Sequence, residues 1–182
     1  MEVLSEKPYT YEDYLELSKT DCIELIDGKI YRLPLPDRIH QKISIGLAAQ
    51  IHAFLSDTSC EVYTAPFEVR LFEDTVAVPD ISVICNPKML DDRGCKGAPG
   101  LVIEILSRSN AIHDKWVKFK LYERAKVREY WIVDPLNDGV EVYLPDEGLW
   151  VINEVYTHKD KAKVTVLPGC EIDLSTVLPE IK

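Results

Sequence analysis

The chain has 182 residues, of which 46% are hydrophobic, so it is long enough to bury a substantial core within one domain. No apolar run approaches the roughly 18 residues of a membrane-spanning helix, and we therefore predict no membrane span. The formal net charge of −10 argues against a nucleic-acid-binding protein whose whole surface is basic.

The cysteines and the N-terminus predict a reducing, cytoplasmic location. The N-terminal residues lack the basic region and apolar core of a secretory signal. The five cysteines stand singly at wide separations, which gives neither a zinc-ligand spacing nor an even set for disulfides. We expect them to be small buried hydrophobic residues. They are Cys22, Cys60, Cys85, Cys95 and Cys170.

The first third of the chain predicts a short helix, a hairpin and a long helix. Thr10 is a suitable N-cap for a helix extending to about residue 19, with acids in its first turn. Apolar runs on both sides of Asp27-Gly28 predict a β-hairpin over residues 23–33. From residue 37 to about residue 56, apolar residues recur at intervals of three and four, which is typical of one buried helix face.

The middle of the chain predicts three strands and a loop. Residues 61–72 alternate moderately and predict one strand, and residues 76–84 predict another, in which Asp80 interrupts an apolar run. Residues 86–97 are rich in Asp, Gly and Pro and predict an exposed loop. Residues 101–106 then form an apolar run that predicts a strand covered on both faces.

Glu104 lies inside this last apolar run, so we expect its carboxylate to be buried. An uncompensated buried carboxylate costs on the order of several kcal/mol. Glu104 must therefore be neutralised, paired with a cationic side chain or bound to a cation.

A helix over about residues 111–125 would follow this strand. At about 100° per residue, Lys118 lies on the same face as Leu121 and Ala125, so its amine is expected to point toward the core. The segment from residue 108 to residue 128 has seven basic and two acidic residues, a net charge of +5, and the rest of the chain carries −15. This basic strip can contact a phosphate backbone, but taken alone it is more simply a solvated helix face.

The last third of the chain predicts strands over residues 128–133 and 140–144, joined by a turn that begins at Asp134-Pro135. Weaker alternation predicts strands over residues 150–156 and 162–167 and a short helical turn near the C-terminus. No repeat, linker or change in composition marks a boundary, so residues 1–182 are predicted to form a single domain.

Asp80, Glu104 and Lys118 together suggest a catalytic site. Two carboxylates brought together raise each other's pKa unless a cation lies between them. Oxygen ligands favour Mg²⁺ or Mn²⁺, with water and a substrate phosphate oxygen in the remaining positions. Such a centre activates water for the cleavage of a phosphodiester.

The order of several short motifs resembles the Uma family of restriction endonucleases, within the PD-(D/E)XK nuclease superfamily. The likeness covers about residues 9–142 and extends more loosely to the C-terminus. The motifs are Ile23-Glu24-Leu25-Ile26-Asp27-Gly28, Val78-Pro79-Asp80, Gly97-Ala98-Pro99 leading to Val102-Ile103-Glu104-Ile105-Leu106-Ser107, Asp114 with Lys118 and Tyr122, and Glu129-Tyr130-Trp131-Ile132-Val133-Asp134-Pro135.

This resemblance implies an α/β (α+β) fold, in which a restriction-endonuclease-like mixed β-sheet is flanked by helices and followed by additional C-terminal strands. It also implies a DNA endonuclease that uses Mg²⁺, with Mn²⁺ as a substitute. Asp80 and Glu104 match the metal-binding acids, and the backbone carbonyl of Ile105 is the additional ligand. By analogy with related nucleases, which need two active sites to cut a duplex, we expect a homodimer.

The resemblance assigns the remaining catalytic roles to Lys118 and Glu24. Leu106 stands where the superfamily has its lysine and cannot orient water. Lys118 matches the helix lysine that fills this role in the Uma-like branch, where it positions or deprotonates water. Glu24 matches an acid ahead of the core motif and orients Lys118 or a metal-bound water.

Structural alternatives remain open for each of these residues. Glu104 and Lys118 can form a buried ion pair without a metal, and Asp114 and Lys118 can form an ordinary pair one helical turn apart. Asp80 after Pro79 can simply cap a strand end. Tyr122, Tyr130 and Trp131 are expected in the core.

Further alternatives concern the periphery of the site and the protein as a whole. Glu24, next to a hairpin, can face solvent, and His40, near the start of the long helix, can reach the site or be structural. The protein can be a catalytically inactive nuclease-fold binding or scaffold protein, or a phosphoesterase acting on RNA or nucleotides.

Overall fold

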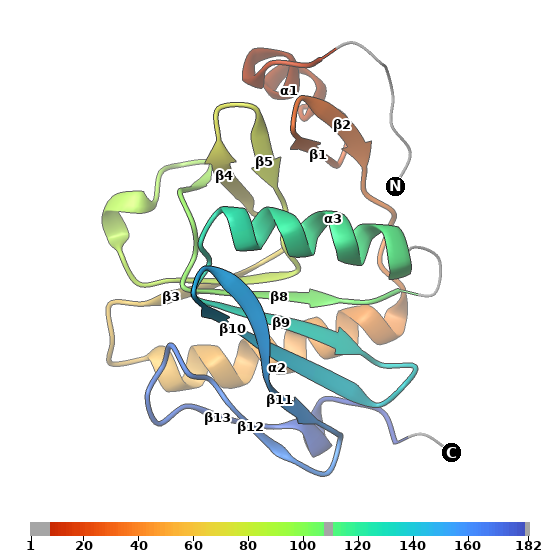
Figure 1. The fold of residues 1–182 in the computed structure, drawn as a ribbon, viewed down its shortest axis with the longest axis vertical. Helices are drawn as coiled ribbons and strands as arrows, with labels where there is room; N and C mark the ends of the chain where they lie inside the picture. Colours follow the sequence, from red (N-terminus) through yellow and green to blue (C-terminus); the bar gives the residue numbers. More distant parts are fainter. Residues whose placement is uncertain (1–7, 108–110, 181–182) are drawn as a thin grey trace.

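The structure, a computed structural model, describes residues 8–107 and 111–180, with side chains for all of these except residues 111–115. Strands of the described residues form a sheet of order β2-β1-β5-β4-β7, a sheet of order β11-β10-β9-β8-β6-β3, and the pair β12-β13 (Figure 1). Both larger sheets and the helices agree with the predicted mixed α+β architecture, which is confirmed.

The N-terminal elements lie where the sequence predicted them. Helix α1 (Tyr11–Leu17) begins after Thr10, which forms a capping box with Asp13, and it ends two residues before the predicted limit. Strands β1 (Ile23–Ile26) and β2 (Lys29–Arg32) pair antiparallel. Asp27 and Gly28, at the turn between them, have φ values of 50° and 71°, the left-handed conformation that a two-residue hairpin turn requires.

Helix α2 (Arg38–Leu55) confirms the prediction of a long amphipathic helix. Asp37 is its N-cap, and the Asp37 side chain accepts a hydrogen bond from the backbone N–H of His40 at 2.8 Å. The buried face of the helix packs on β6, β8 and β9 of the larger sheet. The residues on that face are Ile43, Leu47, Ile51 and Leu55.

Two predicted strands are each divided into two, and the halves belong to different sheets. Residues 61–72 form β3 (Glu61–Thr64) and β4 (Glu68–Phe72), and residues 76–84 form β5 (Thr75–Ala77) and β6 (Ile81–Ile84). A proline lies at each break, Pro66 after a cis peptide bond and Pro79 before Asp80. Because proline cannot donate to a strand ladder, pairing stops there and the chain crosses between the sheets.

The loop predicted over residues 86–97 contains regular structure, which corrects that prediction. It holds the 3₁₀ turn η1 (Pro87–Met89) and strand β7 (Gly94–Lys96), which runs parallel to β4. A Cβ atom at Gly94 would lie 2.0 Å from the Glu68 carbonyl oxygen, so glycine is what allows the two backbones to approach this closely.

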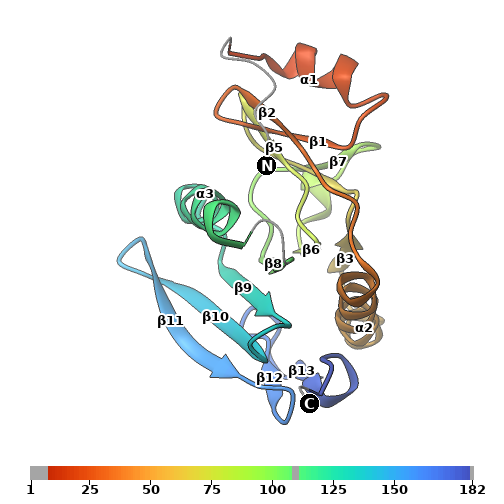
Figure 2. The same cartoon turned by 90° about the vertical axis from the view of Figure 1, so that its right-hand side faces the viewer.

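Strand β8 (Leu101–Ile105) is buried at every position, as predicted. It pairs antiparallel with β6 and parallel with β9 (Glu129–Asp134), to which helix α3 (Ala111–Arg124) provides the crossover. Helices α2 and α3 lie on opposite faces of this part of the sheet (Figure 2). Residues that alternate along β8 therefore face different helices.

The C-terminal third adds antiparallel strands to the sheet. Strands β10 (Gly139–Asp146) and β11 (Leu149–Tyr156) extend it from β9, and η2 (Leu174–Thr176) is the predicted helical turn. The strand predicted over residues 162–167 is only the short β12 (Lys161–Lys163), paired with β13 (Glu171–Asp173). Within the described ranges, no helix has the length and hydrophobicity needed to cross a membrane.

The cysteine prediction is wrong for three of the five residues. A disulfide joins Cys60 and Cys85, which continue the β3–β6 pairing by one position beyond Glu61 and Ile84. Cys22 is exposed, whereas Cys95 and Cys170 are buried as expected. The separation of 25 residues gave no indication of the pairing, because it depends on the division of the two predicted strands.

Glu129 is a fully buried acid that attaches the C-terminal segment to β9. Its carboxylate accepts hydrogen bonds from Trp131 Nε1 at 2.7 Å, the Val166 N–H at 2.7 Å and the Thr165 N–H at 3.1 Å. Glu129→Ala would leave three donors without their acceptor, so we expect a loss of about 3 kcal/mol in unfolding free energy, measured by urea denaturation. Glu171→Ala, at an exposed position, is the control; equal stability of the two variants would contradict this assignment.

Candidate functional site

The register of β6 and β8 brings the two predicted metal-binding acids together. Ile81 pairs with Ile103 and Ser82 pairs with Val102, so continuing the antiparallel register by one residue places Asp80 opposite Glu104. The Ile105 N–H donates to Asp80 Oδ2 at 2.7 Å, which holds the Asp80 carboxylate against β8. The two acids thus lie side by side where β6 begins and β8 ends, although they are 24 residues apart in the chain.

Glu104 is buried, as its apolar surroundings predicted. Its Oε1 atom accepts a hydrogen bond from the Tyr122 hydroxyl at 2.6 Å, and Lys118 Nζ lies 3.0 Å from Oε1 and 3.2 Å from Oε2. Burial raises the pKa of Glu104 to about 7; the charges of Asp80 and Glu24 add to this rise, whereas Lys118 and the Tyr122 hydrogen bond oppose it.

Lys118 lies between two carboxylates. It is 8% exposed, which confirms that it points toward the core, and its Nζ atom lies 3.0 Å from Glu24 Oε1 as well as beside Glu104. Burial alone would lower the pKa of Lys118, but the charges of Glu104 and Glu24 outweigh it and hold the pKa well above its usual value. Lys118 is therefore an ammonium group at neutral pH, suited to donating hydrogen bonds and unsuited to removing a proton from water.

Glu24 contributes to the site from the other sheet. It is fully buried on β1, so the alternative that it faces solvent is wrong. Its Oε1 atom also accepts from the Val78 N–H at 2.8 Å, two residues before Asp80, which fixes the chain where it crosses between the sheets. Its Oε2 atom is buried and has no hydrogen-bond partner among the described residues.

His40 and Tyr122 also belong to the cluster. His40 Nε2 lies 3.1 Å from Asp80 Oδ2. Burial lowers the pKa of His40, but the hydrogen bond and charge of Asp80 outweigh this and raise it overall. The sequence had left the role of His40 open and had assigned Tyr122 to the core. Tyr122 is indeed fully buried, and its spacing of four residues from Lys118 was the available signal that it also reaches Glu104.

Two further predicted positions bear on the site. Leu106 places no polar group where the superfamily lysine would stand, and its backbone N–H donates to the Val133 carbonyl at 2.8 Å. The side chain of Asp114 lies outside the described part of the chain, so its pairing with Lys118 stays a prediction.

The carboxylates of Asp80 and Glu104 offer oxygen atoms of the kind that a hard divalent cation prefers. The hydrogen bond from the Ile105 N–H and the ion-pair contact with His40 Nε2 are both at Asp80 Oδ2, and Oδ1 makes no hydrogen bond within the described residues. Within the described residues, Glu104 Oε2 accepts a hydrogen bond only from Lys118. Among the residues that are described, no three His, Cys, Asp or Glu side chains form a metal-binding group, so a cation here would need a backbone carbonyl or water as well as the two carboxylates.

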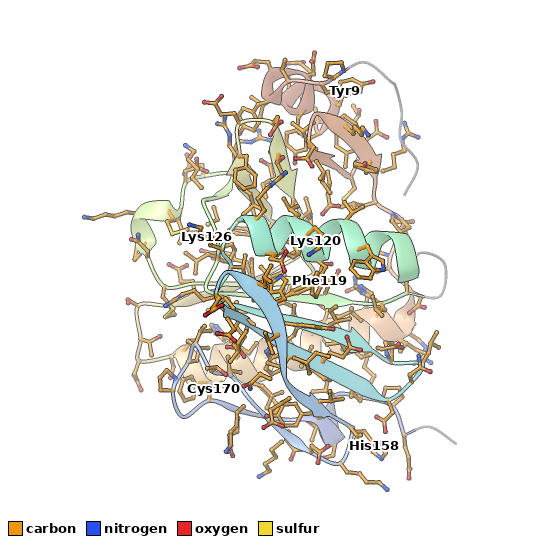
Figure 3. The ribbon with its side chains drawn as sticks, viewed as in Figure 1. Tyr9, Phe119, Lys120, Lys126, His158 and Cys170 are labelled. Carbon is orange, nitrogen blue, oxygen red and sulfur yellow. A yellow bond between two sulfur atoms is a disulfide. The ribbon has the colours of Figure 1, made fainter. Side chains whose placement is uncertain are left out.

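Four basic residues in the described part of the strip are exposed, Lys120, Arg124, Lys126 and Arg128, of which Lys120 and Lys126 are labelled in Figure 3. Lys120 pairs with Glu123 at 2.8 Å, and Arg124 pairs with Asp27 at 2.5 Å. A surface groove of about 870 Å³ beside these pairs includes Trp116 and none of the four predicted catalytic residues. Since acids accompany these two cations, the structure favours a solvated helix face for this part of the strip.

Comparisons with known proteins agree with the resemblance in the motifs. Two uncharacterised proteins of Synechocystis sp. (strain ATCC 27184 / PCC 6803 / Kazusa) are similar in sequence. The protein slr1290 is 28% identical over 146 residues, covering 78% of this chain and 77% of its own length. The protein sll1609 is 27% identical over 162 residues, covering 85% and 92%.

A solved structure and a family model complete the comparison. The crystal structure of a putative nuclease belonging to DUF820 from Anabaena variabilis ATCC 29413 matches with a TM-score of 0.77 and 24% identity, over 94% of this chain and 100% of that chain, which shows a shared fold. The model "Uma2: Putative restriction endonuclease" matches residues 11–175. With this match over most of its length and with the nuclease-like fold, the chain belongs to the Uma2 family of putative restriction endonucleases.

Proposed function

We propose that this protein is a Mg²⁺-dependent endonuclease that hydrolyses phosphodiester bonds of DNA. The observation that carries the proposal is that three residues from different elements lie together. They are Asp80 just before β6, Glu104 on β8 and Lys118 on α3. Family membership supports the reaction class, because the family model describes a restriction endonuclease.

Asp80, Glu104 and the Ile105 carbonyl would hold the cation. When bound, Mg²⁺ supplies charge neutralisation at the phosphate and lowers the pKa of a coordinated water. The side chain of Asp80 is 17% exposed, so this edge of the site is not sealed from an entering phosphate. Oxygen-only ligands suit Mg²⁺, and Mn²⁺ can replace it.

Lys118 would orient water and stabilise the negative charge that develops on the phosphate. Its ammonium group is held by Glu24 and Glu104, and a fixed donor in a buried site costs little reorganisation during the reaction. Glu24 holds the ammonium, and Tyr122 orients Glu104 through its hydroxyl. The resemblance implied that Lys118 either positions or deprotonates water; in this proposal it positions water.

Metal binding and DNA nicking by Asp80→Asn test the proposal. In calorimetry with Mn²⁺, we expect the wild type to give a binding isotherm and Asp80→Asn to weaken affinity at least about tenfold, because one anionic ligand is lost. The same variant should lose Mg²⁺-dependent nicking of supercoiled plasmid. Asp57→Asn, at an exposed position just after α2, is the matched control and should behave as wild type.

Other outcomes would support the alternatives. Identical flat calorimetric traces for wild type and Asp80→Asn would favour a nuclease-fold scaffold in which Glu104 and Lys118 form only a structural ion pair. Binding of Mn²⁺ with hydrolysis of RNA or nucleotides and intact plasmid would favour a different phosphoesterase.

The proposal extends to assembly and location. Cleavage of both DNA strands requires two active sites, so we propose a homodimer. Light scattering after size-exclusion chromatography would measure the molar mass in solution and test this. We also propose a cytoplasmic location, which the cysteines no longer support because Cys60 and Cys85 form a disulfide; fractionation of cells producing the protein would test it.

A further inference from the structure

We propose that His40 is a positioning residue that fixes the Asp80 carboxylate so that only its Oδ1 atom is available to a cation. This inference rests on the proposed function, because it concerns the same site. Asp80 Oδ2 is contacted by His40 Nε2 at 3.1 Å and by the Ile105 N–H at 2.7 Å. One contact comes from α2 and the other from β8, so two separate elements restrain the Asp80 carboxylate.

The donors use the hydrogen-bonding capacity of Oδ2. A carboxylate oxygen can accept two hydrogen bonds; Oδ2 accepts one from the Ile105 N–H and has the His40 Nε2 ion-pair contact at 3.1 Å beside it. Oδ1 makes no hydrogen bond within the described part of the chain. Rotation of the carboxylate would break the hydrogen bond from Ile105 and the ion-pair contact with His40 together, so both contacts favour this one orientation.

His40 is itself held firmly by its helix. The Asp37 side chain caps its backbone N–H at 2.8 Å, and the residues one and two turns further along, Ile43 and Leu47, are fully buried against the sheet. The imidazole is 12% exposed, so it can swing little without displacing the first turn of α2. The packing of α2 in the core therefore determines where the His40 ring lies relative to Asp80.

The geometry assigns positioning rather than proton transfer to His40. Its Nε2 atom is engaged with Asp80, and its Nδ1 atom is buried without a hydrogen-bond partner among the described residues. The contact at Nε2 is therefore the one through which His40 acts on the site. In metal sites generally, groups that orient a ligand in this way change metal affinity by about 10- to 100-fold when removed.

Three variants on α2 test the inference. His40→Phe keeps the ring but removes the donor, and His40→Gln can place an amide donor near the position of Nε2. His52→Phe, on an exposed turn of the same helix, is the matched control. We expect His40→Phe to weaken Mn²⁺ affinity about 10- to 100-fold in calorimetry without DNA, with recovery in His40→Gln and no change in His52→Phe.

A second readout does not depend on metal. The Ile105 amide donates to the oxygen that His40 holds, so hydrogen exchange at this amide should accelerate in His40→Phe and return toward the wild-type rate in His40→Gln. Urea denaturation of each variant establishes that it is folded; if His40→Phe fails to fold, the comparison of His40→Gln with His40→Ala replaces it.

The outcomes separate this inference from the proposed function. A folded His40→Phe variant with wild-type Mn²⁺ affinity and wild-type exchange at Ile105 would overturn the positioning role. A flat Mn²⁺ trace for the wild type would overturn the proposed function, and faster exchange at Ile105 in His40→Phe would then still support the role of His40 in holding Asp80.

Discussion

Replacing Lys118 by methionine is expected to remove plasmid nicking and to weaken Mn²⁺ binding at neutral pH. Methionine has nearly the length of lysine but no charge and no donor, so the oriented ammonium beside Glu104 is lost. Loss of a single fixed donor of this kind lowers rates by about 100- to 1,000-fold. Lys118 lowers the pKa of Glu104, so without it more of the Glu104 carboxyl is protonated at neutral pH and less of it is available to a cation.

The same substitution has a large structural cost that must be separated from the chemistry. Breaking a buried ion pair by removing one partner costs about 3–5 kcal/mol, because the remaining carboxylates are desolvated without a counter-charge. The double variant Glu24→Leu with Lys118→Met removes one of these carboxylates, so it should recover stability but not nicking. Lys120→Met, on the exposed face of α3, is the control for loss of a helix lysine.

Two results would contradict the assignment of Lys118. Nicking by the folded double variant at the wild-type rate would show that the ammonium has no part in the reaction. Mn²⁺ binding by Lys118→Met at neutral pH as tight as that of the wild type would show that Lys118 does not keep Glu104 ionised for the cation.

The sequence predicted helices and buried strands well because their signals are local. The apolar spacing of α2, the cap at Thr10 and the turn at Asp27-Gly28 each specify conformation within a few neighbouring residues. It failed at residues 61–72 and 76–84, where apolar alternation continues across a change of sheet. Pro66 and Pro79 were the local signals of that change, and they mark where ladder pairing stops.

The candidate site was predictable where an unusual residue stood in a strongly patterned element. Glu104 in an apolar strand and Lys118 on the inner face of a helix are anomalous, so each had to have a partner. Glu129 gave no such signal, because two of its three partners are backbone N–H groups 36 and 37 residues further along the chain. His40 was ambiguous for a similar reason, since its contact with Asp80 depends on how α2 packs across the sheet.

Mn²⁺ affinity is expected to fall about tenfold for each pH unit below about pH 7, because Glu104 must lose a proton to bind a cation. Burial raises the pKa of Glu104 to about 7, so the protonated form predominates below that pH and competes with the metal. An ordinary glutamate, with a pKa near 4.3, would leave the affinity flat at and above about pH 5.5. The affinity for Mn²⁺ should therefore increase with pH up to about pH 7 and level off once Glu104 is ionised.

Calorimetry from about pH 5.5 to 7.5, in buffers with different ionisation enthalpies, would measure both the affinity and the protons released on binding. Tyr122→Phe gives an independent check, because the Tyr122 hydroxyl donates to Glu104 Oε1 and lowers its pKa; its removal should move the midpoint to higher pH. Tyr143→Phe is the control, since that hydroxyl donates to Glu141 and not to Glu104. Constant affinity across this range, with no proton released, would mean that Glu104 is already ionised in the free protein or does not bind the cation.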